Sequence, residues 1–100
     1  MKITDLRCAI IANAPIIQIR TDEGITGWGQ IETPKPYVKP QVLDLKDWIV
    51  GQDPRDVERV MRRVRVRGGF KPFGAAVSAI EHALWDIAGK AVNAPAYRLL

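Results

Sequence analysis

The chain has 100 residues, of which 47% are hydrophobic and 26% are charged, and its formal net charge is +4. These fractions are typical of one globular domain and exclude an intrinsically disordered chain. The single cysteine, Cys8, excludes an internal disulfide and a metal site made of cysteines alone. The sequence has no signal-peptide pattern and no run of about 20 apolar residues, so we expect a cytoplasmic protein without a membrane partner.

The first third of the sequence predicts three β-strands. Segments rich in Ile, separated by turn-forming residues, are typical of an antiparallel meander. The predicted strands are residues 3–12, 16–20 and 25–31. Asn13-Ala14-Pro15 separates the first two strands, and the turn at 21–24 requires a positive φ that Gly24 can adopt.

The third predicted strand has one face of bare backbone, because Gly27 and Gly29 flank Trp28. Interior glycines weaken a strand and often mark the close approach of another element. We therefore expect a helix or strand to lie close against these two glycines.

The remaining sequence predicts three helices, at residues 39–50, 54–67 and 75–92. Prolines make residues 32–38 a loop, Asp53 with Pro54 begins the second helix, and Pro95 ends the third. Three strands followed by three helices predict an α+β fold in which the sheet packs on the helices. We expect Trp48 and Trp85 to be mainly buried, so that Trp85→Ala would cost about 3 kcal/mol.

Six arginines gather in the second predicted helix. They are Arg55, Arg59, Arg62, Arg63, Arg65 and Arg67. Apolar residues alternate with them at helical spacing, which indicates a solvated face or a domain contact opposite a buried face. No groove-reading motif or stacking aromatic accompanies them, so we expect no nucleic-acid partner. The alternative is a non-enzymatic binding module that uses this basic helix, which salt-dependent binding to DNA would support.

The only histidine, His82, precedes Asp86 and Lys90 at successive intervals of four residues, so all three share one helix face. A His-Asp pair can orient a general base, but no nucleophile or second histidine is positioned to complete a catalytic set. We interpret these residues as surface partners, and we predict neither a catalytic residue nor a metal ligand in this chain.

Three segments share a distinctive pattern and order. They are TDEGITGWGQ at 21–30, IVGQDP at 49–54, and SAIEHALWDIAGK at 78–90 followed by PAYRLL at 95–100. Together they resemble the amino-terminal domain of the mandelate racemase and muconate lactonizing family of the enolase superfamily, across essentially the whole chain. Gln30 stands where members commonly carry Glu, which leaves the local role of this residue open.

The resemblance implies that residues 1–100 form a capping domain, or lid, over a modified TIM barrel that follows in the same polypeptide. In the family, barrel carboxylates bind Mg²⁺, and barrel acid and base residues remove the proton α to a substrate carboxylate, giving a metal-stabilised enediolate. No barrel motif lies between Met1 and Leu100. We therefore expect this fragment to be inactive alone. The resemblance also implies that the full-length enzyme is a homo-oligomer.

The resemblance also implies that two lid loops contact a small carboxylate substrate, at about residues 13–15 and 32–37. The candidate substrate-binding residues are Asn13, Thr33, Lys35 and Tyr37. Lys35 is the natural partner of a carboxylate, and the alternative is that all four are simply solvated loop residues. The short first loop is similar to that of acid-sugar dehydratases of the galactonate dehydratase type. Dehydration of a sugar acid is thus our first hypothesis, with racemisation or cycloisomerisation as the alternative.

Overall fold

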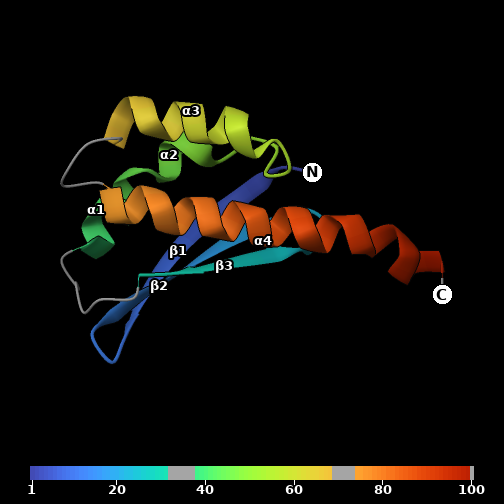
Figure 1. Ribbon diagram of the computed structural model, residues 1–100, viewed down its shortest axis with the longest axis horizontal. Coiled ribbons are helices and arrows are strands. Elements are labelled where there is room, and N and C mark those ends of the chain that lie inside the picture. Colours follow the sequence, from blue (N-terminus) through green and yellow to red (C-terminus); the bar gives the residue numbers. More distant parts are fainter. Residues whose placement is uncertain (32–37, 69–73, 100) are drawn as a thin grey trace.

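The computed structural model describes residues 1–31, 38–68 and 74–99, and these residues form two layers (Figure 1). One layer is an antiparallel sheet in the order β1-β2-β3, and helices cover one face of it. The predicted α+β meander followed by helices is confirmed.

The strands are β1 (Ile3–Ile11), β2 (Ala14–Thr21) and β3 (Thr26–Gln30). The predicted interruption at residues 13–15 is wrong by one residue at its start and two at its end. Ala14 pairs with Ile11, and Pro15 pairs with Ile10, so both belong to β2. The reason is that a two-residue turn already suffices to reverse the chain when both of its residues adopt positive φ.

The described residues form four helices: α1 (Val38–Asp44), α2 (Lys46–Ile49), α3 (Val57–Gly68) and α4 (Gly74–Leu99). The helix predicted at 39–50 divides at Leu45, whose N–H binds the Val42 carbonyl three residues back, in a turn tighter than an α-helix. The helix predicted to end before Pro95 continues to Leu99. Proline lacks an N–H, but its fixed φ is helical, so a helix can pass through it at the cost of a hydrogen bond.

The start of α3 also differs from the prediction, because residues 53–56 form a separate turn. The Asp53 carboxylate accepts a hydrogen bond from the Arg55 N–H at 2.9 Å, and the Asp53 carbonyl accepts one from the Asp56 N–H at 3.2 Å. The helix begins only after this turn is closed. Its predicted buried stripe is confirmed: Val57, Val60, Met61 and Val64 are at most 4% exposed.

The hydrophobic core lies between the sheet and the helices. Alternating strand residues point into it, among them Leu6, Ile17 and Ile19. The helices supply the opposing side chains: Val38, Val42, Leu45, Ile49, Ala76, Ala79, Ile80, Ala83, Leu84 and Ile87. Fully burying one aliphatic side chain of this size contributes about 1.5 to 3 kcal/mol, so this layer dominates the stability of the fold.

The closest approach in the core is between β3 and α4, as expected from the two strand glycines. A Cβ atom on Gly27 would collide with the Ala83 carbonyl oxygen and the Ile87 side chain. A Cβ atom on Gly29 would collide with the Ala79 carbonyl oxygen. Helix backbone thus lies directly on strand backbone, and only glycine fits at these two strand positions.

Helix α4 also binds the free edge of the sheet, which β3 forms. Asp86 Oδ2 accepts a hydrogen bond from the Trp28 backbone N–H at 2.9 Å, and Lys90 Nζ donates one to the Thr26 carbonyl at 2.7 Å. The two side chains also pair with each other at 2.9 Å. Edge strands expose unpaired backbone groups. Here one helix covers both the face and part of the edge of the same strand.

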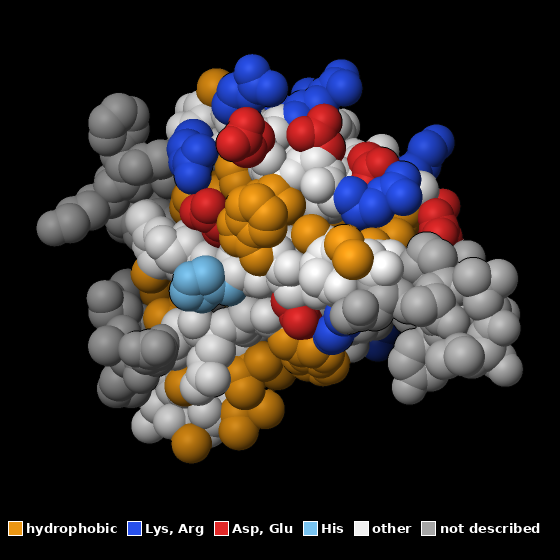
Figure 2. All heavy atoms as spheres, turned by 45° about the vertical axis from the view of Figure 1, so that its right-hand side comes forward, with side chains coloured by type: hydrophobic (Ala, Val, Ile, Leu, Met, Phe, Trp, Pro, Cys, Tyr) orange, Lys and Arg blue, Asp and Glu red, His pale blue; other side chains and the backbone are white. Residues whose placement is uncertain are grey.

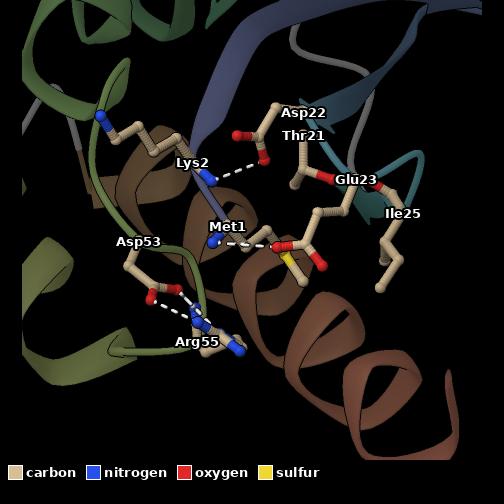
Figure 3. Close-up of polar contacts among 8 residues, drawn as sticks. All are labelled: Met1, Lys2, Thr21, Asp22, Glu23, Ile25, Asp53 and Arg55. Carbon is tan, nitrogen blue, oxygen red and sulfur yellow. Dashed lines mark hydrogen bonds and ion pairs between the residues drawn. The ribbon is translucent and has the colours of Figure 1, made fainter. Parts of the chain in front are cut away.

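Polar contacts fix the end of the sheet at which the chain begins (Figure 3). The Met1 ammonium group pairs with Glu23 Oε2 at 3.0 Å, and the Lys2 N–H donates to Asp22 Oδ1 at 2.8 Å. Gly24 has the predicted positive φ, 79°, in the turn between β2 and β3. The outer edge of β1 is covered as well, because Ile3 exchanges two 2.8 Å backbone hydrogen bonds with Gly51 and Gln52.

The prediction for the tryptophans is wrong for Trp85, which is 55% exposed, whereas Trp48 is partly buried against the core. Residues 75–92 carry apolar side chains on more than one side of the helix. Helical periodicity therefore could not tell which of them face the sheet. The expected cost of about 3 kcal/mol for Trp85→Ala assumes a buried side chain, so it does not apply to this exposed tryptophan.

Asp5 on β1 forms the strongest ion-pair cluster between the sheet and the first helices. Its carboxylate lies 2.6 Å from Lys46 Nζ on α2 and 3.0 Å from Arg7 Nε. Hydrogen bonds from Lys46, and then from Arg7, lower the pKa of Asp5 to about 2 from the ordinary 3.8. The folded state therefore favours the ionised carboxylate.

We predict that Gly29→Ala destabilises the protein by about 3 kcal/mol, because the new methyl group must displace the backbone of α4. The matched control is Gly74→Ala, since a Cβ atom at Gly74 has nothing within 4 Å. Urea denaturation of both variants measures the difference. Equal unfolding midpoints for the two variants would contradict the close β3–α4 contact.

We predict that Asp5 makes stability depend on pH in acid. Because the folded pKa is lower than the unfolded one, this contribution is complete above pH 4 and disappears as pH falls from about 4 to about 2. It amounts to at most about 2 kcal/mol. The free energy of unfolding of the wild type, minus that of Asp5→Asn, should shrink over this interval. A difference that stays constant from pH 6 to pH 2 would refute the assignment.

Candidate functional site

The tip of the β1–β2 hairpin is a two-residue turn formed by Ala12 and Asn13, with φ of 51° and 66°. Two consecutive positive φ values match the right-handed twist of the flanking strands. Asparagine tolerates this conformation, whereas alanine is strained in it by about 1 kcal/mol. Both residues are exposed, so Asn13 is available for contact at one end of the sheet.

The end of β3 lies beside the same hairpin. Ile16 pairs with Gln30, and the Ile31 N–H donates a 3.0 Å hydrogen bond to the Pro15 carbonyl. The segment that follows Ile31 therefore departs from the end of the sheet that carries Asn13. Both loops that the resemblance implies for substrate contact start at this end, which we call the loop end.

Three of the four candidate residues, Thr33, Lys35 and Tyr37, lie outside the described residues. Their proposed contact with substrate stays a prediction, as does that of Asn13. The structure gives the two ends of their loop, which are Ile31 directly after β3 and Val38 at the start of α1, both buried. Sequence spacing alone could not have shown that Ile31 bonds beside the hairpin.

A hollow of about 380 Å³ lies next to the hairpin. It is lined by Arg7, Cys8, Ala9, Ile11, Ile16, Gln18 and Trp28. The lining is largely apolar, and its one charged group, Arg7, is already paired with Asp5 at 3.0 Å. Burial raises the pKa of the Cys8 thiol, so at neutral pH it stays protonated and is a poor nucleophile. Arg7 is thus the one lining group with the charge to bind an anion, and its Nε is already engaged by Asp5.

Asp86 has a structural role, because it joins α4 to the edge of β3. Burial tends to raise its pKa, but hydrogen bonds from Lys90 and from the Trp28 N–H outweigh this effect, so the net pKa lies below the ordinary value. A carboxylate that stays ionised and holds two donors is a poor proton acceptor. The predicted pairing of Asp86 with Lys90 is confirmed, and His82 is exposed on the same helix. No local sequence pattern indicated that this pair also binds β3.

Within residues 1–31, 38–68 and 74–99, no three His, Cys, Asp or Glu side chains come together in a way that could hold a metal ion. None of the helices described there is both long and apolar enough to span a membrane.

The arginines of the α3 region lie on its exposed side, as predicted for Arg59, Arg62, Arg63 and Arg65. Several have partners: Arg65 pairs with Glu81 at 3.4 Å, and Arg63 Nε donates to the Trp48 carbonyl at 3.1 Å. Arg55 pairs with Asp53 at 2.9 Å (Figure 3). Figure 2 shows basic and acidic side chains interleaved along the upper part of the molecule, rather than one continuous basic patch.

Comparisons with known proteins agree with this fold. Residues 8–100 match the family model for the N-terminal domain of mandelate racemase and muconate lactonizing enzyme. The D-galactonate dehydratase of Klebsiella pneumoniae (strain 342) is 43% identical over 89 aligned positions, covering 84% of this chain and 23% of that protein. The D-galactonate dehydratase of Verminephrobacter eiseniae (strain EF01-2) is 38% identical over 106 aligned positions, covering 100% of this chain and 28% of the relative.

Solved structures show the same relationship. An enolase from Agrobacterium radiobacter, bound to Na and L-malate, superimposes with a TM-score of 0.84 at 30% identity, covering 93% of this chain and 26% of that one. The 3,6-anhydro-D-galactonate cycloisomerase of Zobellia galactanivorans gives a TM-score of 0.80 at 25% identity, covering 92% of this chain and 29% of that one.

The chain spans only about a quarter of the length of these relatives. The matched part is nevertheless nearly the whole of this chain. On this evidence, the chain belongs to the mandelate racemase and muconate lactonizing enzyme N-terminal domain family of the enolase superfamily.

Proposed function

We propose that residues 1–100 are the lid of a longer enzyme that removes the proton α to a carboxylate, and that its reaction is dehydration of an acid sugar. The observation that carries this proposal is the 38 to 43% identity with D-galactonate dehydratases over 84 to 100% of the chain. Identity of this level over the lid favours a shared substrate class, because in this family the lid loops contact the substrate.

The loop end suits this role. The β1–β2 turn contains only Ala12 and Asn13, so it leaves room above the site for an extended polyhydroxy acid. The Asn13 side-chain amide can both donate to and accept from hydroxyl groups. Thr33, Lys35 and Tyr37 would complete the contacts from the neighbouring loop, with Lys35 next to the substrate carboxylate.

A lid must hold its loops in place while it excludes water from the reacting groups. The hairpin belongs to a sheet whose third strand is held by α4 through its face and its edge. Substrate contacts at the loop end would therefore be made from a rigid base. This arrangement supports positioning and specificity rather than proton transfer.

The reaction centre itself would belong to a C-terminal barrel domain of the same polypeptide. The described residues do not fit the Mg²⁺ that the family implies, because no three potential ligands converge. Bound in the barrel, Mg²⁺ would supply positive charge beside the carboxylate whose α-proton is removed. The acid and base residues would be there too.

Cycloisomerisation or racemisation is the second candidate, because the same proton removal begins those reactions. The cycloisomerase from Zobellia galactanivorans shares the fold of this chain with a TM-score of 0.80. A mandelate racemase/muconate lactonizing enzyme-like protein from Rubrobacter xylanophilus also gives a TM-score of 0.80, at 31% identity.

The reaction can be tested on the protein encoded by the complete reading frame. We expect it to convert an aldonic or aldaric acid to the 2-keto-3-deoxy acid in the presence of Mg²⁺, measured by coupling the new ketone to semicarbazide. Turnover restricted to amino-acid or mandelate-like substrates would reject dehydration. A stop codon directly after codon 100 would reject the two-domain organisation.

We predict that Asn13 affects substrate binding in that enzyme. Asn13→Gly keeps the positive φ but removes the amide, and should raise KM about tenfold, the factor that about 1.4 kcal/mol of lost hydrogen bonding gives. Asn13→Asp keeps the size and adds a negative charge, so it should raise KM for an anionic substrate further. The matched control is Thr4→Asp, which adds the same charge at the opposite end of β1. Equal KM values for all four proteins would show that Asn13 does not contact the substrate.

A further inference from the structure

The exposed sides of α3 and α4 differ in chemistry. The exposed residues of α3 are mostly charged, among them Glu58, Arg59, Arg62 and Arg65, with one large apolar exception, Val66. On α4, five exposed residues recur at alternating intervals of four and three, and thus form one line along the helix. They are Ser78, His82, Trp85, Gly89 and Val92, which we call the α4 stripe. None is an acid, a lysine or an arginine.

The α4 stripe exposes two large apolar side chains on one helix, Trp85 and Val92. Trp85 is 55% exposed and Val92 is 78% exposed, while Ala83 and Ile87 on the opposite side of the helix are fully buried. Single exposed apolar residues are common on protein surfaces. A line without acids, lysines or arginines is different on a helix that already buries its opposite side, because a helix with apolar groups on two opposite sides is normally covered on both.

The position of α4 in the chain identifies what would cover it. The family is defined by an N-terminal domain, and the chain spans 23 to 28% of the D-galactonate dehydratases it matches. Helix α4 is the last described element and runs to Leu99. In a longer polypeptide, the next segment starts at the end of this helix, so it is present near the stripe at high effective concentration.

We propose that the α4 stripe is the surface on which the C-terminal domain of the same polypeptide docks. This inference rests on the proposed lid function and adds the residues of the contact. Helix α4 would then lie between two partners, with its small buried residues against β3 and its exposed tryptophan against the second domain. Burial of Trp85 and Val92 would hold the lid to the barrel without fixing the loop end.

Thiol labelling of the full-length protein tests the proposal. Ser78→Cys and Val92→Cys place a thiol at two points of the stripe, and Arg62→Cys places one on the exposed side of α3 as the matched control. Each variant is treated with N-ethylmaleimide, and modification of the engineered residue is followed by peptide mass spectrometry. Rates are divided by those of the same variant in denaturant, which removes intrinsic differences among the sites.

We expect the normalised rates at positions 78 and 92 to be at least tenfold lower than at position 62. Rates within twofold of the control would overturn the proposal. Protection that disappears on dilution would also overturn it, because the covering partner would then be a second copy. Since labelling requires no turnover, protection in a protein that dehydrates no sugar acid would uphold the docking surface and reject only the proposed reaction.

A charge substitution gives a second, independent measurement. Trp85→Glu should restore fast labelling of the Val92→Cys thiol by weakening the docked state, whereas Arg62→Glu should leave that thiol protected. Unchanged protection in a folded Trp85→Glu protein would contradict a contact through this tryptophan. If Trp85→Glu does not fold, the rates of the two stripe cysteines still decide the question.

Discussion

Direct backbone contact between β3 and α4 is the constraint on which the rest of this fold depends. Gly27 and Gly29 remove side chains from one face of the strand, so the helix lies against it through Ala79 and Ala83. The same helix then reaches around the strand, where Asp86 and Lys90 bind its edge. Two of the segments that carry the family resemblance, residues 21–30 and 78–90, meet in this contact. Packing and edge protection therefore explain Gly27 and Gly29 in the first segment and Asp86 and Lys90 in the second.

This arrangement separates the stable part of the domain from the part that would meet substrate. The α4–β3 contact fixes the sheet, and the sheet presents the hairpin tip and the end of β3 together at the loop end. Loop sequences there can vary without disturbing the core, which suits the specificity role proposed above. The charged groups that the structure shows near the sheet, such as Asp5 and Asp86, are engaged in ion pairs and hold elements together.

Much of the fold could be predicted from the sequence, and the failures have physical reasons. Apolar segments separated by turn residues predicted the three strands, and Gly27 with Gly29 predicted the close contact with a helix. Helical periodicity could not show which residues of 75–92 face the sheet, because this segment carries apolar residues on more than one side of the helix. The prediction that Trp85 lies in the core was wrong for this reason. The spacing of Asp86 and Lys90 predicted their pairing, but their bonds to β3 join residues about 60 positions apart and have no local signal. At the loop end, Asn13 could be predicted because it lies in the short segment between the first two strands. That both loops start at the same end of the sheet could be seen only from the pairing of β2 with β3 and from the bond between Ile31 and Pro15.

The proposed lid function means that this domain covers a reaction centre that it does not contain. The most direct measurement is complementation between separately produced parts of the enzyme: residues 1–100, the remaining C-terminal polypeptide, and a mixture of the two, each assayed for dehydration of D-galactonate. We expect turnover by the mixture and none by residues 1–100 alone, and we expect the C-terminal part alone to have severely reduced activity. Turnover by residues 1–100 alone, or full activity of the C-terminal part without them, would contradict the proposed lid function.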